Sequence, residues 1–160
     1  MARISMELLE KKTKEVLAER GVDLSDIAEI VYNLQKPYQE KLTKELCLKS
    51  VEAVLKKREV AHAILTGVVL DQLAEEKKLP EPLQTIVEND DGLYGIDEIL
   101  PLSIVNLYGS IGFTNYGYLD KAKPGILSKL DNKSGPKLHT FMDDLVAGIA
   151  AAAASRIAHS

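Results

Sequence analysis

The chain has 160 residues, of which 46% are hydrophobic and 28% are charged, and its formal net charge is −4. These values are typical of a globular protein with one core, so we expect a single domain. The acidic balance, without a basic arm, argues against nucleic-acid binding.

The hydrophobic pattern predicts four amphipathic helices in the first half, residues 1–80. A helix over 5–20 ends at Gly21, and a second has Ser25 as its predicted N-cap and stops near Pro37. The third and fourth helices are predicted over 41–58 and 60–77. In the third helix we expect these residues to face the core: Leu46, Val51, Val54 and Leu55.

The second half, residues 88–160, is richer in acids and glycines. After a break at Pro80 and Pro82, Asp90-Asp91-Gly92 predicts a turn. A helix is predicted from about Asp97, with Pro101 in or near its first turn. Three further segments follow: a loop or broken helix over 109–117, a short helix starting at Pro124 and ending at Leu130, and a loop over 131–137.

The last predicted helix starts near Thr140 and continues through a run of alanines to Ala154. Thr140 and Asp143 have the spacing of a capping box. Gly148 lies one turn after Asp144 and would let another backbone come close. With no alternating strand pattern, the sequence predicts an all-α bundle of six to eight helices around this small-residue helix.

The candidate chemistry lies in carboxylates at three element junctions, with one lysine nearby: Asp97 and Glu98, Asp120 with Lys123, and Asp143 with Asp144. Hard divalent ions such as Mg²⁺ prefer oxygen ligands, and a lysine supplies a point charge for phosphate. Carboxylates, a metal ion and a lysine are the components of metal-assisted phosphoryl hydrolysis. Spacing alone leaves a purely structural role open, because acids are common in the first turn of a helix.

Three blocks of sequence resemble, in order, the signature blocks of the phosphatidylglycerophosphatase A family. They are Asp97-Glu98, Leu119-Asp120-x-x-Lys123-Pro124, and Met142-Asp143-Asp144-x-Val146-Ala147-Gly148. The likeness covers approximately the last 70 residues, and the three motifs in the right order are more specific than any one of them. Over its whole length the chain looks most like a soluble branch of that family, whose members are labelled low temperature requirement C or phosphatidylglycerophosphatase A-related.

The resemblance implies a Mg²⁺-dependent phosphatase that converts phosphatidylglycerophosphate to phosphatidylglycerol. It also implies that Lys123 holds the phosphate and that five carboxylates are metal ligands or acid–base groups: Asp97, Glu98, Asp120, Asp143 and Asp144. The implied substrate is a phosphorylated lipid or a small phosphate ester. A lipid substrate would require peripheral contact with the membrane.

The N-terminus carries charge from its first helical turn, which is unlike a signal peptide. The longest apolar run, Leu145 to Ala154, is about half the length that crosses a bilayer. With a single cysteine, Cys47, no internal disulfide can form. We therefore expect a cytoplasmic protein, at the inner membrane face if its substrate is a lipid.

Two alternatives stay open at this point. One is a non-enzymatic regulatory or cold-response protein that keeps the family fold. The other is a homo-oligomeric scaffold that uses the small residues of the last helix to pack against a second copy. The enzyme hypothesis requires the acids to converge in one cleft, whereas the regulatory hypothesis predicts dispersed acids or a site without room for phosphate.

Overall fold

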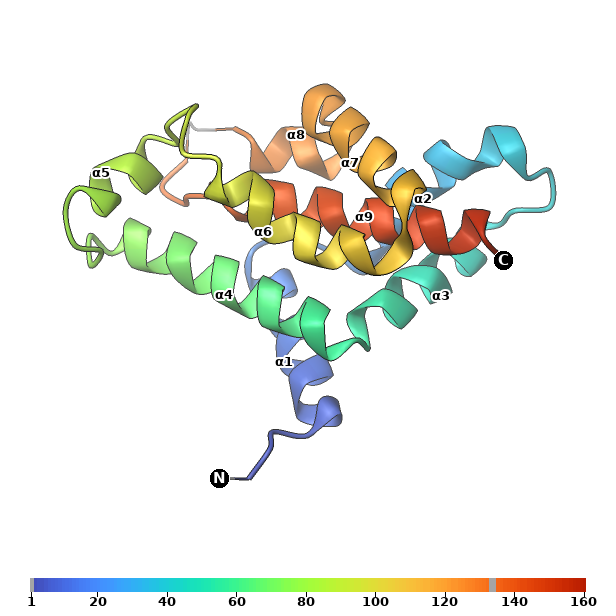
Figure 1. The fold of residues 1–160 in the computed structure, drawn as a ribbon, viewed down its shortest axis with the longest axis horizontal. Coiled ribbons are helices and arrows are strands. Elements are labelled where there is room, and N and C mark those ends of the chain that lie inside the picture. Colours follow the sequence, from blue (N-terminus) through green and yellow to red (C-terminus); the bar gives the residue numbers. More distant parts are fainter. Residues whose placement is uncertain (1, 133–134) are drawn as a thin grey trace.

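In this computed structural model, which describes residues 2–132 and 135–160, the last helix runs through the middle of the molecule. This helix, α9 (Met142–Ala158), is buried at every position except Arg156 and Ala158. Figure 1 shows the other helices arranged around it, and six of them contact it directly: α2, α3, α4, α6, α7 and α8. The expected central helix of small residues is confirmed.

Nine α-helices and two short 3-10 helices make up the described part of the chain, which contains no strand. The α-helices are α1 (Met6–Glu19), α2 (Leu24–Gln35), α3 (Lys44–Leu55), α4 (Arg58–Glu75), α5 (Leu83–Glu88), α6 (Ile96–Val105), α7 (Ser110–Ala122), α8 (Ile126–Leu130) and α9. The all-α prediction is confirmed. In residues 2–132 and 135–160, no helix combines the length and hydropathy needed to cross a membrane.

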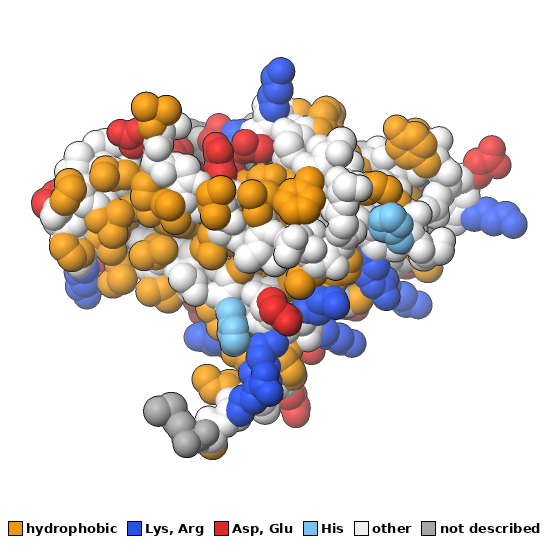
Figure 2. Space-filling model, viewed as in Figure 1, with side chains coloured by type: hydrophobic (Ala, Val, Ile, Leu, Met, Phe, Trp, Pro, Cys, Tyr) orange, Lys and Arg blue, Asp and Glu red, His pale blue; other side chains and the backbone are white. Residues whose placement is uncertain are grey.

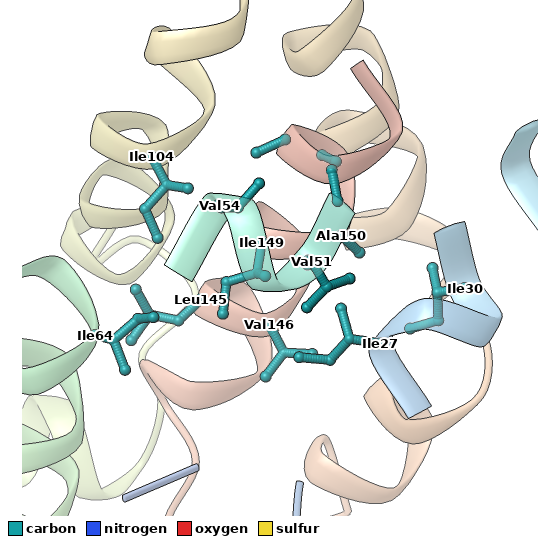
Figure 3. Close-up of a cluster of buried hydrophobic side chains, with 14 of the residues drawn as sticks. Ile27, Ile30, Val51, Val54, Ile64, Ile104, Leu145, Val146, Ile149 and Ala150 are labelled. Atoms are coloured by element: carbon teal, nitrogen blue, oxygen red, sulfur yellow. The ribbon is translucent and has the colours of Figure 1, made fainter. Parts of the chain in front are cut away.

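The core forms where the apolar faces of these helices meet α9. Figure 3 shows side chains of α2, α3, α4 and α6 packed around those of the first half of α9. All of the following are buried: Ile27 and Ile30 of α2, Val51 and Val54 of α3, Ile64 of α4, Ile104 of α6, and Leu145, Val146, Ile149 and Ala150 of α9. The small residues of α9 allow its neighbours to approach closely, and this positions the polar ends of several helices at one place.

Gly148 allows one of these close approaches. A Cβ placed on Gly148 would lie 3.1 Å from Pro101 Cβ and 3.3 Å from the Pro101 carbonyl oxygen. The prediction that another backbone comes close to Gly148 is therefore confirmed, and the partner is α6. This contact brings the α6 acids and the α9 acids to the same end of the molecule.

The first four predicted helices are present, with two local corrections. α1 is followed by Gly21 in the left-handed region, with a φ of 82°. The N-cap of α2 is Asp23 and not Ser25, because the Asp23 side chain accepts the Ser25 N–H and forms a capping box with Asp26. Leu46 was predicted to face the core, but its side chain is 49% exposed.

The second half differs more from the prediction. α5 was not expected from the sequence pattern, and 110–122 is one continuous helix instead of a loop or broken helix. Pro101 lies inside α6, in its second turn, where its ring packs on Gly148. The short helix α8 starts at Ile126, two residues after Pro124. Of the predicted loop over 131–137, residues 133 and 134 lie outside the described residues.

Candidate functional site

An acidic cleft opens where the beginnings of α6 and α9 meet the end of α7. It has a volume of about 250 Å³, and all six residues that the sequence singled out line it together with four others: Asp97, Glu98, Asp120, Lys123, Asp143 and Asp144, with Asp90, Asp91, Gly92 and Asp131. Acidic side chains are visible along the edge of α6 in Figure 2. The three separate sequence blocks thus contribute to one cavity.

The α6 wall of the cleft is the first turn of that helix. Gly95 precedes it with a φ of 76°, a left-handed conformation that glycine adopts without strain. The first-turn acids Asp97 and Glu98 follow, where the positive end of the helix dipole favours negative charge. Asp97 is buried and Glu98 is exposed, so the two carboxylates lie at different depths.

The α7 wall supplies one acid and the only amino group among the described residues that line the cleft. Asp120 lies in the last turn of α7, and Lys123 follows the helix in a left-handed conformation with φ 46° and ψ 56°. The Lys123 Nζ donates a hydrogen bond to Asp143 Oδ2 at 2.9 Å. The same Nζ lies 3.5 Å from Asp120 Oδ1 and 4.0 Å from Asp131 Oδ1. Lys123 therefore joins the end of α7 to the beginning of α9.

The α9 wall is the first turn of the central helix, with Asp143 and Asp144. The predicted capping box is wrong: the N-cap residue is Phe141, and its side chain makes no capping hydrogen bond. The Thr140 Oγ1 donates instead to the Val87 carbonyl oxygen at 2.8 Å, which ties the start of α9 to α5.

The free N–H groups at the start of α9 are capped from α4. Asp71 is fully buried, and its carboxylate accepts the Phe141 N–H at 3.0 Å and the Met142 N–H at 3.0 Å. Burial raises the pKa of Asp71 to about 8, against the lowering effect of these two N–H groups. Sequence reasoning missed Asp71, since its role comes from a contact 70 residues along the chain.

A second buried network holds the segment that leads into α9. The Arg20 guanidinium donates to both Glu75 carboxylate oxygens, at 3.2 and 2.6 Å, and to the Leu138 carbonyl oxygen. Glu75 Oε1 also accepts the Leu138 N–H at 2.6 Å. Both backbone groups of Leu138 are therefore fixed from α1 and α4, and the direction in which α9 enters the cleft is fixed with them.

The electrostatics of the cleft show an excess of negative charge. Burial raises the pKa of Asp143 to about 6, although Lys123 acts to lower it. Burial and the neighbouring Asp143 raise the pKa of Asp144 to about 11, and burial also raises the pKa of Asp97. Burial opposes a charge on Lys123, yet the surrounding carboxylates hold the pKa of its amino group above its ordinary value.

The carboxyl groups deepest in the cleft touch one another. The Asp144 side chain is within hydrogen-bond reach of both Asp97 and Asp120. Two ionised carboxylates cannot form a hydrogen bond, so a proton must remain between such a pair unless a cation replaces it.

The donor set has the chemistry of a hard divalent cation site, because the described lining residues offer several carboxylate oxygens and neither sulfur nor imidazole. In residues 2–132 and 135–160, however, no three His, Cys, Asp or Glu side chains are already arranged around a point that could hold a metal ion. The Lys123 Nζ stands among the carboxylates instead. The residues fit a Mg²⁺ ion by donor type, with Asp97, Asp120, Asp143 and Asp144 as the ones that would gather around it and Glu98 nearest to solvent.

Sequence reasoning did not assign a site role to four residues that line the cleft. Asp90, Asp91 and Gly92 were interpreted only as a turn, and Asp131 only as a loop residue. The turn interpretation holds locally, because Asp91 Oδ1 accepts the Leu93 N–H at 2.9 Å. Only the acidity of these segments could have indicated a site role, and acidity alone does not tell a cleft from a solvated surface.

Comparisons with known proteins place this cleft in a family context. Residues 20–159 match the family described as phosphatidylglycerophosphatase A, so the match spans most of the chain and all three acidic blocks. The chain is 60% identical over 151 residues to the uncharacterised protein YutG of Bacillus subtilis (strain 168), with 94% of this chain and 91% of YutG covered.

Solved structures agree on the fold. The crystal structure of the low temperature requirement C protein from Listeria monocytogenes superposes with a TM-score of 0.92 at 60% sequence identity, covering 94% of this chain and 95% of that one. The crystal structure of protein YpjQ from Bacillus subtilis gives a TM-score of 0.93 at 60% identity, covering 98% and 96%. The arrangement of helices around α9 is therefore shared with these proteins.

Proposed function

The chain belongs to the phosphatidylglycerophosphatase A family, and we propose that it is a Mg²⁺-dependent phosphatase that hydrolyses a phosphate monoester. The observation that carries the proposal is the convergence of the three acidic blocks, 97–98, 120–123 and 143–144, in one cleft. These blocks lie on three different helices, so their meeting is a property of the fold and not of a local charge run.

The carboxylates of the cleft would hold the metal ion. Asp97, Asp120, Asp143 and Asp144 would supply oxygen ligands from three helices, and Glu98 lines the same cleft. When bound, Mg²⁺ neutralises charge on the phosphate and activates water. In its absence Asp144 keeps a proton, because burial and Asp143 raise its pKa to about 11.

Lys123 would orient the phosphate group. Its ammonium is the one cationic group among the described residues of the cleft lining, and a phosphate dianion needs a positive partner among so many acids. The left-handed backbone at Lys123 ends α7 and turns the chain toward Pro124, and the amino group lies beside Asp143 in the cleft. Its hydrogen bond to Asp143 would be exchanged for one to a phosphate oxygen.

Glu98 would act on the attacking water. It is the exposed member of the acidic set, and burial and the Asp120 carboxylate raise its pKa above the ordinary value. A carboxylate with a raised pKa is a better proton acceptor near neutral pH. Glu98 would therefore take a proton from the water as the new phosphorus–oxygen bond forms and the ester phosphorus–oxygen bond breaks. The oxygen of the leaving alcohol would then take up that proton or one from solvent.

The size of the cleft, about 250 Å³, suits a phosphate with part of its alcohol, and it would leave acyl chains outside. By family membership the substrate would be phosphatidylglycerophosphate, which yields phosphatidylglycerol. A soluble phosphate ester would satisfy the same ligands, since the charged cleft residues would bind the phosphate and the ion and not the acyl chains.

Phosphate release from a panel of substrates tests this proposal. Phosphatidylglycerophosphate in mixed micelles and glycerol 3-phosphate in solution would each be incubated with the protein, in Mg²⁺ and in EDTA. We expect release from at least the lipid, and only in Mg²⁺. Release from neither substrate by folded protein in Mg²⁺ would contradict the phosphatase assignment, whereas release from the soluble ester alone would replace the lipid as substrate.

A further inference from the structure

One face of the molecule, formed by α4 and α6, is apolar and almost without charge. Figure 2 shows hydrophobic side chains over the region where α4 and α6 lie in Figure 1. We define the α4–α6 face by six residues that are exposed or only partly buried there: Leu65, Val69 and Leu73 of α4, and Ile96, Ile99 and Leu100 of α6. A contiguous apolar patch on a folded protein marks an interaction surface.

The α4 part of this face is a long stretch of helix that has no exposed charged side chain. Between Glu59 and Glu75 the only Asp, Glu, Lys or Arg is Asp71, which is fully buried. By contrast α3, which also has an outer face, carries two lysines and two glutamates along its 12 residues. Val69, at 48% exposure, stands in the middle of the uncharged stretch.

The α6 part continues the same surface. Ile96 and Ile99 are 51% and 60% exposed and lie three residues apart, so they share one side of the helix. Leu100 connects them to α4, because its Cδ2 lies 3.3 Å from the place where a Cβ on Gly67 would stand. The two acids of α6, Asp97 and Glu98, line the cleft and so do not interrupt the face.

We propose that the α4–α6 face binds the same face of a second copy of this chain, forming a twofold-symmetric dimer. A twofold axis sets each residue of a surface against that same surface, so any charge near the axis meets its own copy. A face free of charge avoids this repulsion. The proposal concerns a surface outside the cleft and does not rest on the proposed phosphatase activity.

The extent of the face fits this partner. α4 has 18 residues and is therefore about 27 Å long. α6 beside it has 10 residues and is about 15 Å long. With each helix about 10 Å across, the face covers roughly 400 Å² per copy, which is the size of a small interface with a concentration-dependent dimer.

A bilayer is the less suitable partner for this surface. Anionic membrane surfaces attract proteins through clustered Lys and Arg. None of the six residues of the face is basic, so the face lacks this attraction. Apolar contact with a like surface does not require basic residues.

Sedimentation velocity on the full-length protein, from about 1 to 100 µM, tests the dimer. We expect the wild type to sediment as a dimer and both Val69→Lys and Ile99→Lys to raise the dimer dissociation constant at least about 100-fold, because each substitution sets two lysines near the axis. Leu46→Lys is the matched control: Leu46 is 49% exposed, like Val69, but it lies on α3, and this variant should remain dimeric. Circular dichroism would show that all three variants keep their helices.

Three results would overturn the proposal. The first is a monomeric wild type at 100 µM, and the second is a dimer that survives both α4–α6 substitutions. The third is a monomer that sediments with vesicles of phosphatidylcholine and phosphatidylglycerol and loses that binding in Val69→Lys and Ile99→Lys but not in Leu46→Lys. That last result would assign the same face to a lipid surface.

Discussion

The Lys123 Nζ lies 2.9 Å from Asp143 Oδ2 and joins the end of α7 to the first turn of α9. The two residues are 20 positions apart in sequence and belong to different signature blocks. Their contact lies at one side of the cleft, and it places the Lys123 ammonium next to the buried acids Asp143 and Asp144. In the proposed mechanism, this ammonium binds Asp143 in the free protein and a phosphate oxygen in the complex.

Replacing Lys123 tests its role with phosphate. Lys123→Gln should lower kcat/KM about 10–100-fold, the loss expected for one hydrogen bond to a charged group. The matched control is Lys121→Gln, since Lys121 is exposed on the last turn of α7 and does not line the cleft. Equal losses in the two variants would show that Lys123 acts only through general electrostatics.

The contact between Gly148 and Pro101 makes a stability prediction. Gly148→Ala would set a Cβ 3.3 Å from the Pro101 carbonyl oxygen, and we expect it to lower the free energy of unfolding by ~1–3 kcal/mol. Gly117→Ala serves as the control, because a Cβ there meets no atom within 4 Å and the substitution favours the helix by ~0.5–1 kcal/mol. Urea unfolding of both variants measures the difference. A neutral Gly148→Ala would show that α6 can move away from α9 without cost.

The cap that Asp71 provides for α9 can be tested by two substitutions. Asp71→Ala would leave the Phe141 and Met142 N–H groups buried without an acceptor, at a cost of about 2–4 kcal/mol in unfolding free energy. Asp71→Asn keeps an acceptor oxygen and should cost clearly less. If both variants unfold at the same urea concentration, the cap does not stabilise α9.

The raised pKa of Asp71 also predicts a pH dependence of stability. Burial raises this pKa to about 8 in the folded protein, whereas the unfolded carboxyl titrates near its ordinary value of about 3.9. The folded state therefore binds the proton more tightly, and stability from this group is lost as the pH rises from about 4 to about 8. The difference in unfolding free energy between wild type and Asp71→Asn should change across this window. A constant difference would contradict the shift.

Metal binding should depend on pH because the carboxylates must lose protons to bind a cation. Burial raises the pKa of Asp143 to about 6, and burial with Asp143 raises that of Asp144 to about 11. We therefore expect Mg²⁺ to bind more tightly at pH 8 than at pH 6 and to release protons on binding. Calorimetry in two buffers of different ionisation enthalpy measures that release. Binding with no proton release at either pH would contradict a ligand group built from these protonated acids.

Much of the fold could be predicted because the first four helices have strong apolar periodicity and clear stop signals. The segment 110–122 could not be predicted, since it contains glycines and polar residues with weak helix propensity. Tertiary packing stabilises the helix there. A Cβ on Gly112 would lie 3.0 Å from Val105 Cγ1, so the glycine is needed for α7 to pack against the end of α6.

The candidate site could be located in part because its acids occur in compact blocks at helix ends. The sequence could not show that Asp71, Arg20 and Glu75 hold the start of α9, since these residues act through contacts across 55 to 118 positions. Val69 illustrates the same limit: its apolar character fits a core position, yet the structure leaves it exposed. Only the packing of α4 against its neighbours decides which side is covered.

The phosphatase proposal is tested most directly by comparing wild type with Asp144→Asn in the release of phosphate from phosphatidylglycerophosphate in mixed micelles containing Mg²⁺. Asp144 is buried, and it touches both Asp97 and Asp120 within the proposed ligand group. We expect turnover by the wild type that EDTA abolishes, and a loss of at least about 100-fold in the folded variant, as expected when a buried metal ligand is removed. Wild-type turnover that persists in EDTA, or an Asp144→Asn variant as active as the wild type, would contradict the proposal.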